Sequence, residues 1–159
     1  MDENQQPGIR IGQVFLGKAS FEHTAEALNT PPGPGQASEH ALNVSMTAAI
    51  SPDGRMGLIT LTVQTTPESK GQYRFLVEMV GLVEQEPGAE NMPMAQYLNT
   101  AAGATMFPFM REAVANLTGR GRYGPVWLKP LNFGTMKPAT PPVEAYAFDD
   151  RGTENPRAG

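Results

Sequence analysis

Cysteine is absent from the 159 residues of this chain, histidine occurs only twice, and 12 Lys and Arg stand against 16 Asp and Glu. Without cysteine there is no disulfide, thiolate nucleophile or sulfur-rich metal site, which fits a reducing cytoplasm. The formal net charge of −4 provides no basic field that could neutralise phosphates or anionic lipid. These absences argue against nucleic acid and against a membrane surface as partners.

Long apolar runs are missing as well. Gly, Pro or a charged residue interrupts every hydrophobic stretch well before the roughly 20 residues that a membrane-spanning helix requires. Residues 1–8 are acidic and polar, whereas a secretory signal begins with basic residues and continues with an apolar run. We therefore expect a cytoplasmic protein with a flexible N-terminus over residues 1–8 and no insertion into a membrane.

The remaining composition suits one domain with one core, as does the length. Hydrophobic residues make up 40% of the chain, whereas charged residues make up 18%, below the roughly 25% that is usual in globular domains. A surface with so little charge can carry apolar area that a partner covers.

Four segments are predicted to be strands, three because apolar and polar side chains alternate along them and the third in order because it is rich in Leu, Ile, Val and Thr. They are residues 9–22, 41–50, 55–66 and 72–86. The turn sequence Ser51-Pro52-Asp53-Gly54, between the second and third segments, favours a tight reversal between antiparallel neighbours. These patterns therefore predict four strands, of which the second and third are antiparallel neighbours.

The first predicted strand places five apolar residues on one face, namely Ile9, Ile11, Phe15, Ala19 and Phe21. We expect glycine to bend two of the strands, at Gly17 and at Gly81. Between the first and second strands, the run of Pro and Gly over residues 31–35 can continue neither a ladder nor a helix. We therefore predict a surface loop over residues 23–38.

After Pro87-Gly88 the hydrophobic period changes to about 3.6 residues, which indicates helices. We predict a short helix that starts near Pro93 and ends at Gly103, and a longer one that is opened by Pro108 and stopped by Gly119. Residues 122–133 hold two prolines among large apolar side chains and are predicted to form an ordered loop. Residues 134–159 are rich in Pro, Thr, Gly and charge, which predicts a flexible tail.

Candidate catalytic residues are few. His23 and His40 lack the partner spacing of a catalytic base or a metal ligand, so we interpret both as surface residues. No serine lies in a Gly-x-Ser-x-Gly elbow, and the glycines at 119 and 121 end a helix where a phosphate cradle would open one. We expect no enzymatic activity, no catalytic residue, no metal site and no cofactor.

Glu78 shares a predicted strand face with Arg74 and Leu76. A solvated cross-strand ion pair is the ordinary interpretation of such residues. An acidic docking surface is the functional alternative, and the residues alone leave both open.

The most unusual feature is an apolar and aromatic group around the second predicted helix and the loop that follows it. Its members are Phe107, Phe109, Tyr123, Trp127, Leu128, Leu131 and Phe133. Core packing accounts for such residues, yet a rigid loop with Trp and Leu in a chain with nine methionines is also typical of an adaptable hydrophobic groove for peptides. The sequence leaves both interpretations open.

Three short motifs in residues 94–133 resemble the signature of the SecB family of export chaperones. They are Phe-Pro-Phe-Met-Arg-Glu over residues 107–112, Arg-Gly-Arg-Tyr-Gly-Pro over 120–125 and Lys-Pro-Leu-Asn-Phe over 129–133. The upstream Ser20-Phe21-Glu22 and the Phe75-Leu76-x-Glu78 pattern are also similar to the family. The resemblance covers roughly residues 9–133, which we expect to form one SecB-like chaperone domain.

The resemblance implies an α+β fold in which helices pack on one side of a four-stranded antiparallel sheet, assembled as a homotetramer, a dimer of dimers. It implies an ATP-independent holdase that keeps precursor polypeptides unfolded in hydrophobic grooves and supports their export through the Sec translocase. The seven apolar and aromatic residues become candidates for that groove. Glu22, Leu76 and Glu78 match the family's docking surface for the translocation ATPase SecA.

The chain departs from the family pattern at two places. Lys18 stands where the family has an acidic residue, which reverses a charge of the expected SecA surface. The long C-terminal helix of the family cannot form over residues 134–142, which contain three prolines. Both changes suit an alternative function as a solitary SecB-like module dedicated to one partner, such as an antitoxin.

Overall fold

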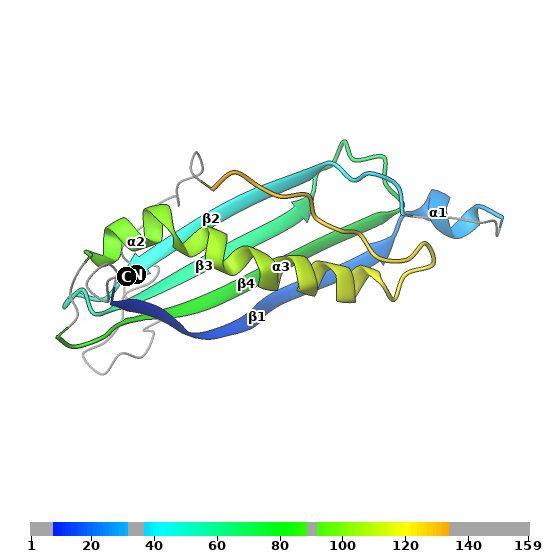
Figure 1. Ribbon diagram of the computed structural model, residues 1–159. Helices are drawn as coiled ribbons and strands as arrows, with labels where there is room; N and C mark the ends of the chain where they lie inside the picture. Colours follow the sequence, from blue (N-terminus) through cyan, green and yellow to red (C-terminus); the bar gives the residue numbers. More distant parts are fainter. Residues whose placement is uncertain (1–7, 32–36, 89–91, 134–159) are drawn as a thin grey trace, which may run out of the picture.

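The computed structural model describes residues 8–31, 37–88 and 92–133 (Figure 1). Its elements in chain order are β1 (Ile9–His23), α1 (Ala25–Asn29), β2 (Leu42–Ile50), β3 (Met56–Thr65), β4 (Tyr73–Gln85), α2 (Met94–Thr100) and α3 (Ala102–Thr118). The strands form one antiparallel sheet in the order β1-β4-β3-β2, and α2 and α3 cover one of its faces. The predicted α+β class and architecture are confirmed. The predictions for residues 1–7 and 134–159 lie outside the described residues.

The core lies between α3 and the two central strands. Met106, Met110 and Val114 of α3 are fully buried, as are Val77 and Val83 on the face of β4 that alternation predicts. The remaining buried apolar residues of β3 and β4 join them in one cluster. None of the helices in the described residues is long and apolar enough to cross a membrane.

At Gly81 the backbone of β4 lies close to the side chain of Met106 in α3. The register of β4 runs through Gly81 without a shift on either side, so this position has no bulge. A Cβ atom at this position would lie 2.7 Å from Met106 Sδ. Because glycine has no side chain, α3 can pack directly on the sheet at this position.

Two register shifts divide β1, between Ile11 and Gln13 and between Leu16 and Lys18. The second confirms the bend predicted at Gly17, but the first has no counterpart in the predicted alternation. Because an extra residue exchanges the two faces of a strand, Phe15 lies opposite the helices, where it is 39% exposed. The prediction that Phe15 shares a face with the core-facing residues of β1 is therefore wrong.

The turn between β2 and β3 forms as predicted. The Asp53 carboxylate accepts hydrogen bonds from the Ser51 hydroxyl at 2.6 Å and from the Arg55 N–H at 3.0 Å. These bonds, the Ser51 hydroxyl first, lower the pKa of Asp53. Gly54 has a φ of 72°, the left-handed conformation that such a turn requires.

The helices depart from their predicted boundaries. The break between α2 and α3 falls at Ala101, so Gly103 lies inside α3, where a Cβ would meet the Phe133 ring at 2.6 Å. Pro108 lies in the interior of α3 and does not open a helix. Within the predicted loop 23–38, residues 25–29 form α1, whose first turn is capped by the Thr24 hydroxyl.

Candidate binding groove

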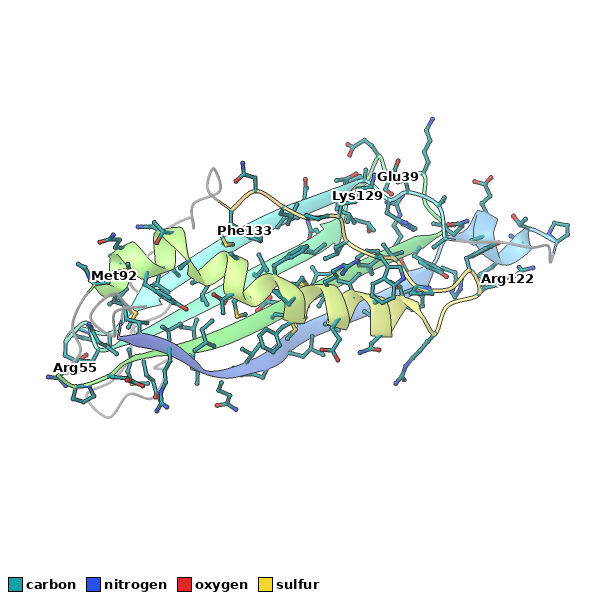
Figure 2. The ribbon with its side chains drawn as sticks, viewed as in Figure 1. Glu39, Arg55, Met92, Arg122, Lys129 and Phe133 are labelled. Carbon is teal, nitrogen blue, oxygen red and sulfur yellow. The ribbon has the colours of Figure 1, made fainter. Side chains whose placement is uncertain are left out.

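The loop wall, residues 122–133, leaves the end of α3 and runs back along the helices toward the start of α3 (Figure 2). As predicted, it is ordered without being a helix or a strand. Arg122 marks its beginning at the α1 end of the molecule and Phe133 marks its end beside α3. Its order has to come from side chains, since it has no regular backbone ladder.

Three side chains from two elements hold the backbone of the loop wall. The Thr118 hydroxyl accepts a hydrogen bond from Val126 N–H at 2.8 Å, and Arg111 Nε donates one to the Leu128 carbonyl at 3.2 Å. The Tyr73 hydroxyl, from β4, accepts from the Tyr123 N–H at 2.7 Å and donates to a carbonyl one residue later at 2.9 Å. The wall is thus fixed before any partner arrives.

Both histidines also hold backbone amides. His40 Nε2 accepts from the Tyr73 N–H at 3.1 Å, and His23 Nε2 accepts from the Arg122 N–H at 3.0 Å. Both rings are half-buried, so the prediction of two surface histidines is wrong. The spacing of residues in the sequence does not predict this role, because the backbone N–H groups that the histidines accept from lie 33 and 99 positions away along the chain.

Burial lowers the pKa of His40, while the Ser38 backbone opposes this shift and the charge of Arg74 adds to it. The Ser38 backbone raises this pKa although the buried Nδ1 atom of His40 forms no hydrogen bond of regular geometry with any of the described residues. Because the folded-state pKa lies below the ordinary value of about 6.5, the stabilisation from neutral His40 is present above that pH. It is lost as the pH falls through the lowered value.

The groove is a cavity of about 900 Å³ between the loop wall and the segment that leads into β2. Tyr123, Trp127, Leu128 and Leu131 line it from the loop wall, and Leu42 and Val44 line it from β2. Leu128 is buried, whereas the Trp127 side chain is 59% exposed. The Arg111 guanidinium carbon lies 5.3 Å from the centre of the Trp127 ring, close enough for a cation–π contact.

Charged side chains form the rim of the groove. Glu39 and Lys129 face each other from its two sides and form an ion pair (Figure 2). The hydrogen bond and charge of Lys129 lower the pKa of Glu39. Glu68 and Lys70 line the same cavity, so its rim carries charge of both signs around an apolar floor.

The seven predicted groove residues do not form one surface. Tyr123, Trp127, Leu128 and Leu131 line the groove. The rings of Phe107 and Phe133 pack on each other with centres 5.7 Å apart, and Phe133 is a core residue. The seventh, Phe109, projects from α3 into a different hollow.

That hollow is the β1–α3 cavity, which has a volume of about 460 Å³. Val14, Leu16 and Met79 line it from the sheet, and Phe109 and Leu117 line it from α3. Leu16 is 53% exposed and Phe109 is 43% exposed. The cavity is therefore an apolar hollow that remains open to solvent in the single chain.

The predicted docking residues lie together on the sheet face opposite the helices. In the antiparallel register of β1 and β4, Glu22 pairs with Arg74, Ser20 with Leu76 and Lys18 with Glu78. The Arg74 guanidinium donates to carbonyl oxygens of the β3–β4 loop, at residues 66, 67 and 69. The ordinary interpretation of Glu78 is thus wrong, since none of the ion pairs in the described part of the chain includes it.

A profile of the family described as "Preprotein translocase subunit SecB" matches residues 2–138. The chain belongs to the SecB family. The SecB protein-export protein of Acidithiobacillus ferrooxidans (strain ATCC 53993 / BNL-5-31) is 32% identical over 144 residues, which cover 86% of this chain and 91% of the relative. The SecB protein of Actinobacillus succinogenes is 29% identical over 139 residues, covering 85% and 81%. The resemblance seen in the three motifs is therefore confirmed, and the chain is a SecB-family protein-export chaperone.

A solved structure supports the SecB fold. The SecB-like chaperone of Mycobacterium tuberculosis, in complex with a peptide from an antitoxin, superposes with a TM-score of 0.59 at 18% identity. The match covers 77% of this chain and 90% of that chain. At this identity the likeness concerns the fold alone.

Proposed function

We propose that this SecB-family chaperone holds unfolded precursor polypeptides in the groove between the loop wall and β2, without ATP and without catalytic residues. The observation that carries the proposal is Trp127, a large side chain that is 59% exposed on a backbone held by hydrogen bonds. An exposed aromatic residue on a fixed wall gains contact area only when a partner covers it.

The groove suits an unfolded client for physical reasons. Contact between its apolar floor and apolar segments of the client lowers the free energy of the complex. The folded client would later bury these segments itself. Because Thr118 and Arg111 already fix the wall, binding does not have to order it, and the entropy cost falls on the client alone. A holdase needs only this difference in affinity between unfolded and folded client, and no hydrolysis step.

The experiment that tests the proposal is light scattering of the purified protein with chemically unfolded clients that fold slowly. Several clients of unrelated sequence, with no ATP present, should remain in solution at stoichiometric chaperone. An unreactive control protein of equal mass should leave them to aggregate. If the chaperone suppresses aggregation of none of them, the holdase proposal is wrong.

The second candidate function is a module dedicated to one partner, such as an antitoxin. Two observations favour it: Lys18 changes the docking face, and the Mycobacterium tuberculosis relative of this fold was solved with an antitoxin peptide. The breadth of clients decides between the two. Binding that is confined to one partner, in the same assay, would support the dedicated module.

We propose that copies assemble in the cytoplasm into a homotetramer, a dimer of dimers, and that the β1–α3 cavity forms one of its contacts. Leu16 and Phe109 supply exposed apolar area there. Glu112, Asn116 and Arg120 follow one another at helical spacing along the rim. A two-fold axis at Asn116 would bring Glu112 of each copy to Arg120 of the other, the self-complementarity that an isologous contact requires. The mass from light scattering tests this assembly.

Docking to SecA is proposed on the face that carries Glu22, Leu76 and Glu78, and Lys18 should weaken it. Replacing Lys18 by Glu places a carboxylate beside Glu78 in register. We expect the affinity for the zinc-binding tail of SecA to rise about three- to tenfold at low salt, because acidic and basic surfaces then match. Calorimetric titration with the isolated tail measures the change.

The matched control for this substitution is Lys70→Glu, which makes the same change of charge at the groove rim. The gain should be specific to Lys18 and should shrink at about 1 M salt. An equal gain in both variants would show a net-charge effect and would contradict docking at this face.

A further inference from the structure

The chain contains two histidines, and both rings pack against the same tyrosine. The His40 ring stacks on Tyr73 with centres 5.5 Å apart and planes at 16°, and the His23 ring meets it edge-on at 5.2 Å and 88°. Each imidazole uses Nε2 as an acceptor for a backbone N–H, of Tyr73 itself and of Arg122. Residues from β1, the segment before β2, β4 and the loop wall therefore meet at one point.

We propose that His23 and His40 are positioning residues of the groove, which hold its two walls only while their imidazoles are neutral, so that acid releases the walls and weakens client binding. The expected effect of acid on client binding rests on the proposed holdase function. The positioning of the walls does not depend on it.

The chemistry follows from the direction of the two hydrogen bonds. A neutral imidazole that accepts at Nε2 carries its proton on Nδ1, and protonation turns Nε2 into a second donor. That donor would then face a backbone N–H at about the same 3 Å, so both bonds would be lost. For His40 the new charge would also be half-buried, where burial and Arg74 disfavour it and only the Ser38 backbone favours it.

The path from these bonds to the groove is short. The Arg122 N–H held by His23 is the first amide of the loop wall, and the next amide, of Tyr123, is held by the Tyr73 hydroxyl. His40 lines the groove itself, from the segment opposite. Loss of the two acceptors therefore loosens the wall that carries Trp127 and the segment that faces it.

Tight packing keeps the rings in place at neutral pH. A Cβ at Gly71 would lie 2.1 Å from His40 Cδ2, and a Cβ at Gly121 would lie 2.7 Å from the Tyr73 ring. Both glycines are thus needed for the rings to approach the backbone so closely. Within this packing an imidazolium has little freedom to turn toward solvent.

The charged groups around the two rings carry both signs. Arg74 of β4 acts against protonation of His40. Glu39 is engaged by Lys129, and Glu22 is adjacent to His23 in β1 and so points to the other sheet face. Arg122 presents a second cation, which lies over the Tyr123 ring. The other charged residues of the groove beside His40 are Glu68 and Lys70.

The test uses the single tryptophan, because Trp127 is the only one in the chain. Its emission and the affinity for a client peptide are measured between about pH 7.5 and about pH 5, the range in which histidine titrates. The peptide contains only Leu, Phe, Lys and Ser, has blocked termini and carries a rhodamine label, so it has no group that titrates there. We expect the Trp127 emission to shift and the affinity to fall about five- to tenfold at the acidic end.

The matched variant is His23→Gln/His40→Gln, whose amide oxygens can accept the same N–H groups but do not titrate. Its affinity at about pH 7.5 serves as its own reference, and from that value the variant should show no dependence on pH. An unchanged Trp127 emission in the parent protein, or the same shift in the variant, would overturn the inference.

Two further measurements test the positioning of the walls without the variant and separately from client binding. Nitrogen NMR of the parent protein should find both imidazoles neutral at about pH 7.5, with the proton on Nδ1. A proton on Nε2 would overturn the inference. A Trp127 emission that shifts with pH while the peptide affinity does not would support the positioning role and contradict the holdase groove.

Discussion

Replacing Trp127 with alanine is expected to weaken the binding of unfolded clients by at least tenfold, about 1.4 kcal/mol or more, as is usual for an interface tryptophan. The free energy of unfolding should change by less than about 1 kcal/mol, since the side chain is 59% exposed and leaves no buried cavity. Titration of a labelled, unfolded client and urea unfolding measure the two quantities separately.

The matched control is Phe15→Ala, which removes an exposed aromatic ring from the sheet face opposite the helices. This variant should bind clients as the parent protein does. If Trp127→Ala lowers stability as much as it lowers affinity, Trp127 is a core residue and is not the residue that binds clients in the groove.

Replacing Phe133 with alanine is expected to lower the free energy of unfolding by about 3–5 kcal/mol. The Phe133 ring is 7% exposed, packs on Phe107 and fills the space left by Gly103 of α3. Its removal therefore leaves a cavity that the rigid start of α3 cannot close. Urea unfolding followed by circular dichroism measures the loss.

Phe15→Ala is the control for this second prediction, because it deletes the same side chain where the ring is 39% exposed and outside the proposed contact between copies. Its cost to the unfolding of the single chain should stay below about 1.5 kcal/mol. Equal costs for the two variants would show that Phe133 does not close the core as its burial indicates.

The central strand β4 could be predicted because it obeys one simple rule. Residues of β4 alternate between buried and partly exposed from Tyr73 to Met79, as the sequence pattern predicts. The rule fails in β1, where an extra residue near Gly12 exchanges the two faces and moves Phe15 to the far side. A bulge leaves no clear mark in a pattern of apolar and polar residues, so such a reversal cannot be located from the pattern alone.

The helix boundaries were harder because Gly and Pro act through their surroundings. Gly103 lies inside α3 to make room for Phe133 and Met46, and Pro108 lies in the helix interior. Local propensity predicts an end and a beginning at these positions, whereas tertiary packing uses them differently. Only the partner residues, distant in sequence, explain the choice.

The site could be predicted only in part, again because some of its residues are distant from one another in the sequence. Trp127 and its neighbours in the loop wall were identifiable as a dense apolar group between prolines. Tyr73 and His23, which hold that wall, lie isolated along the chain and contact it from 50 and 99 positions away, and His40 holds Tyr73 from 33 positions away. No spacing rule connects them, so their role emerges only from the fold.

The central claim is that unfolded polypeptide binds in the groove beside Trp127, and the emission of this single tryptophan tests it most directly. An unfolded client without tryptophan is titrated into the protein while light scattering records its aggregation. The emission of Trp127 should shift to shorter wavelength and saturate at the same ratio at which aggregation stops, because the client covers the ring. A client that is kept in solution while the emission of Trp127 stays unchanged would place the binding surface elsewhere and contradict this account.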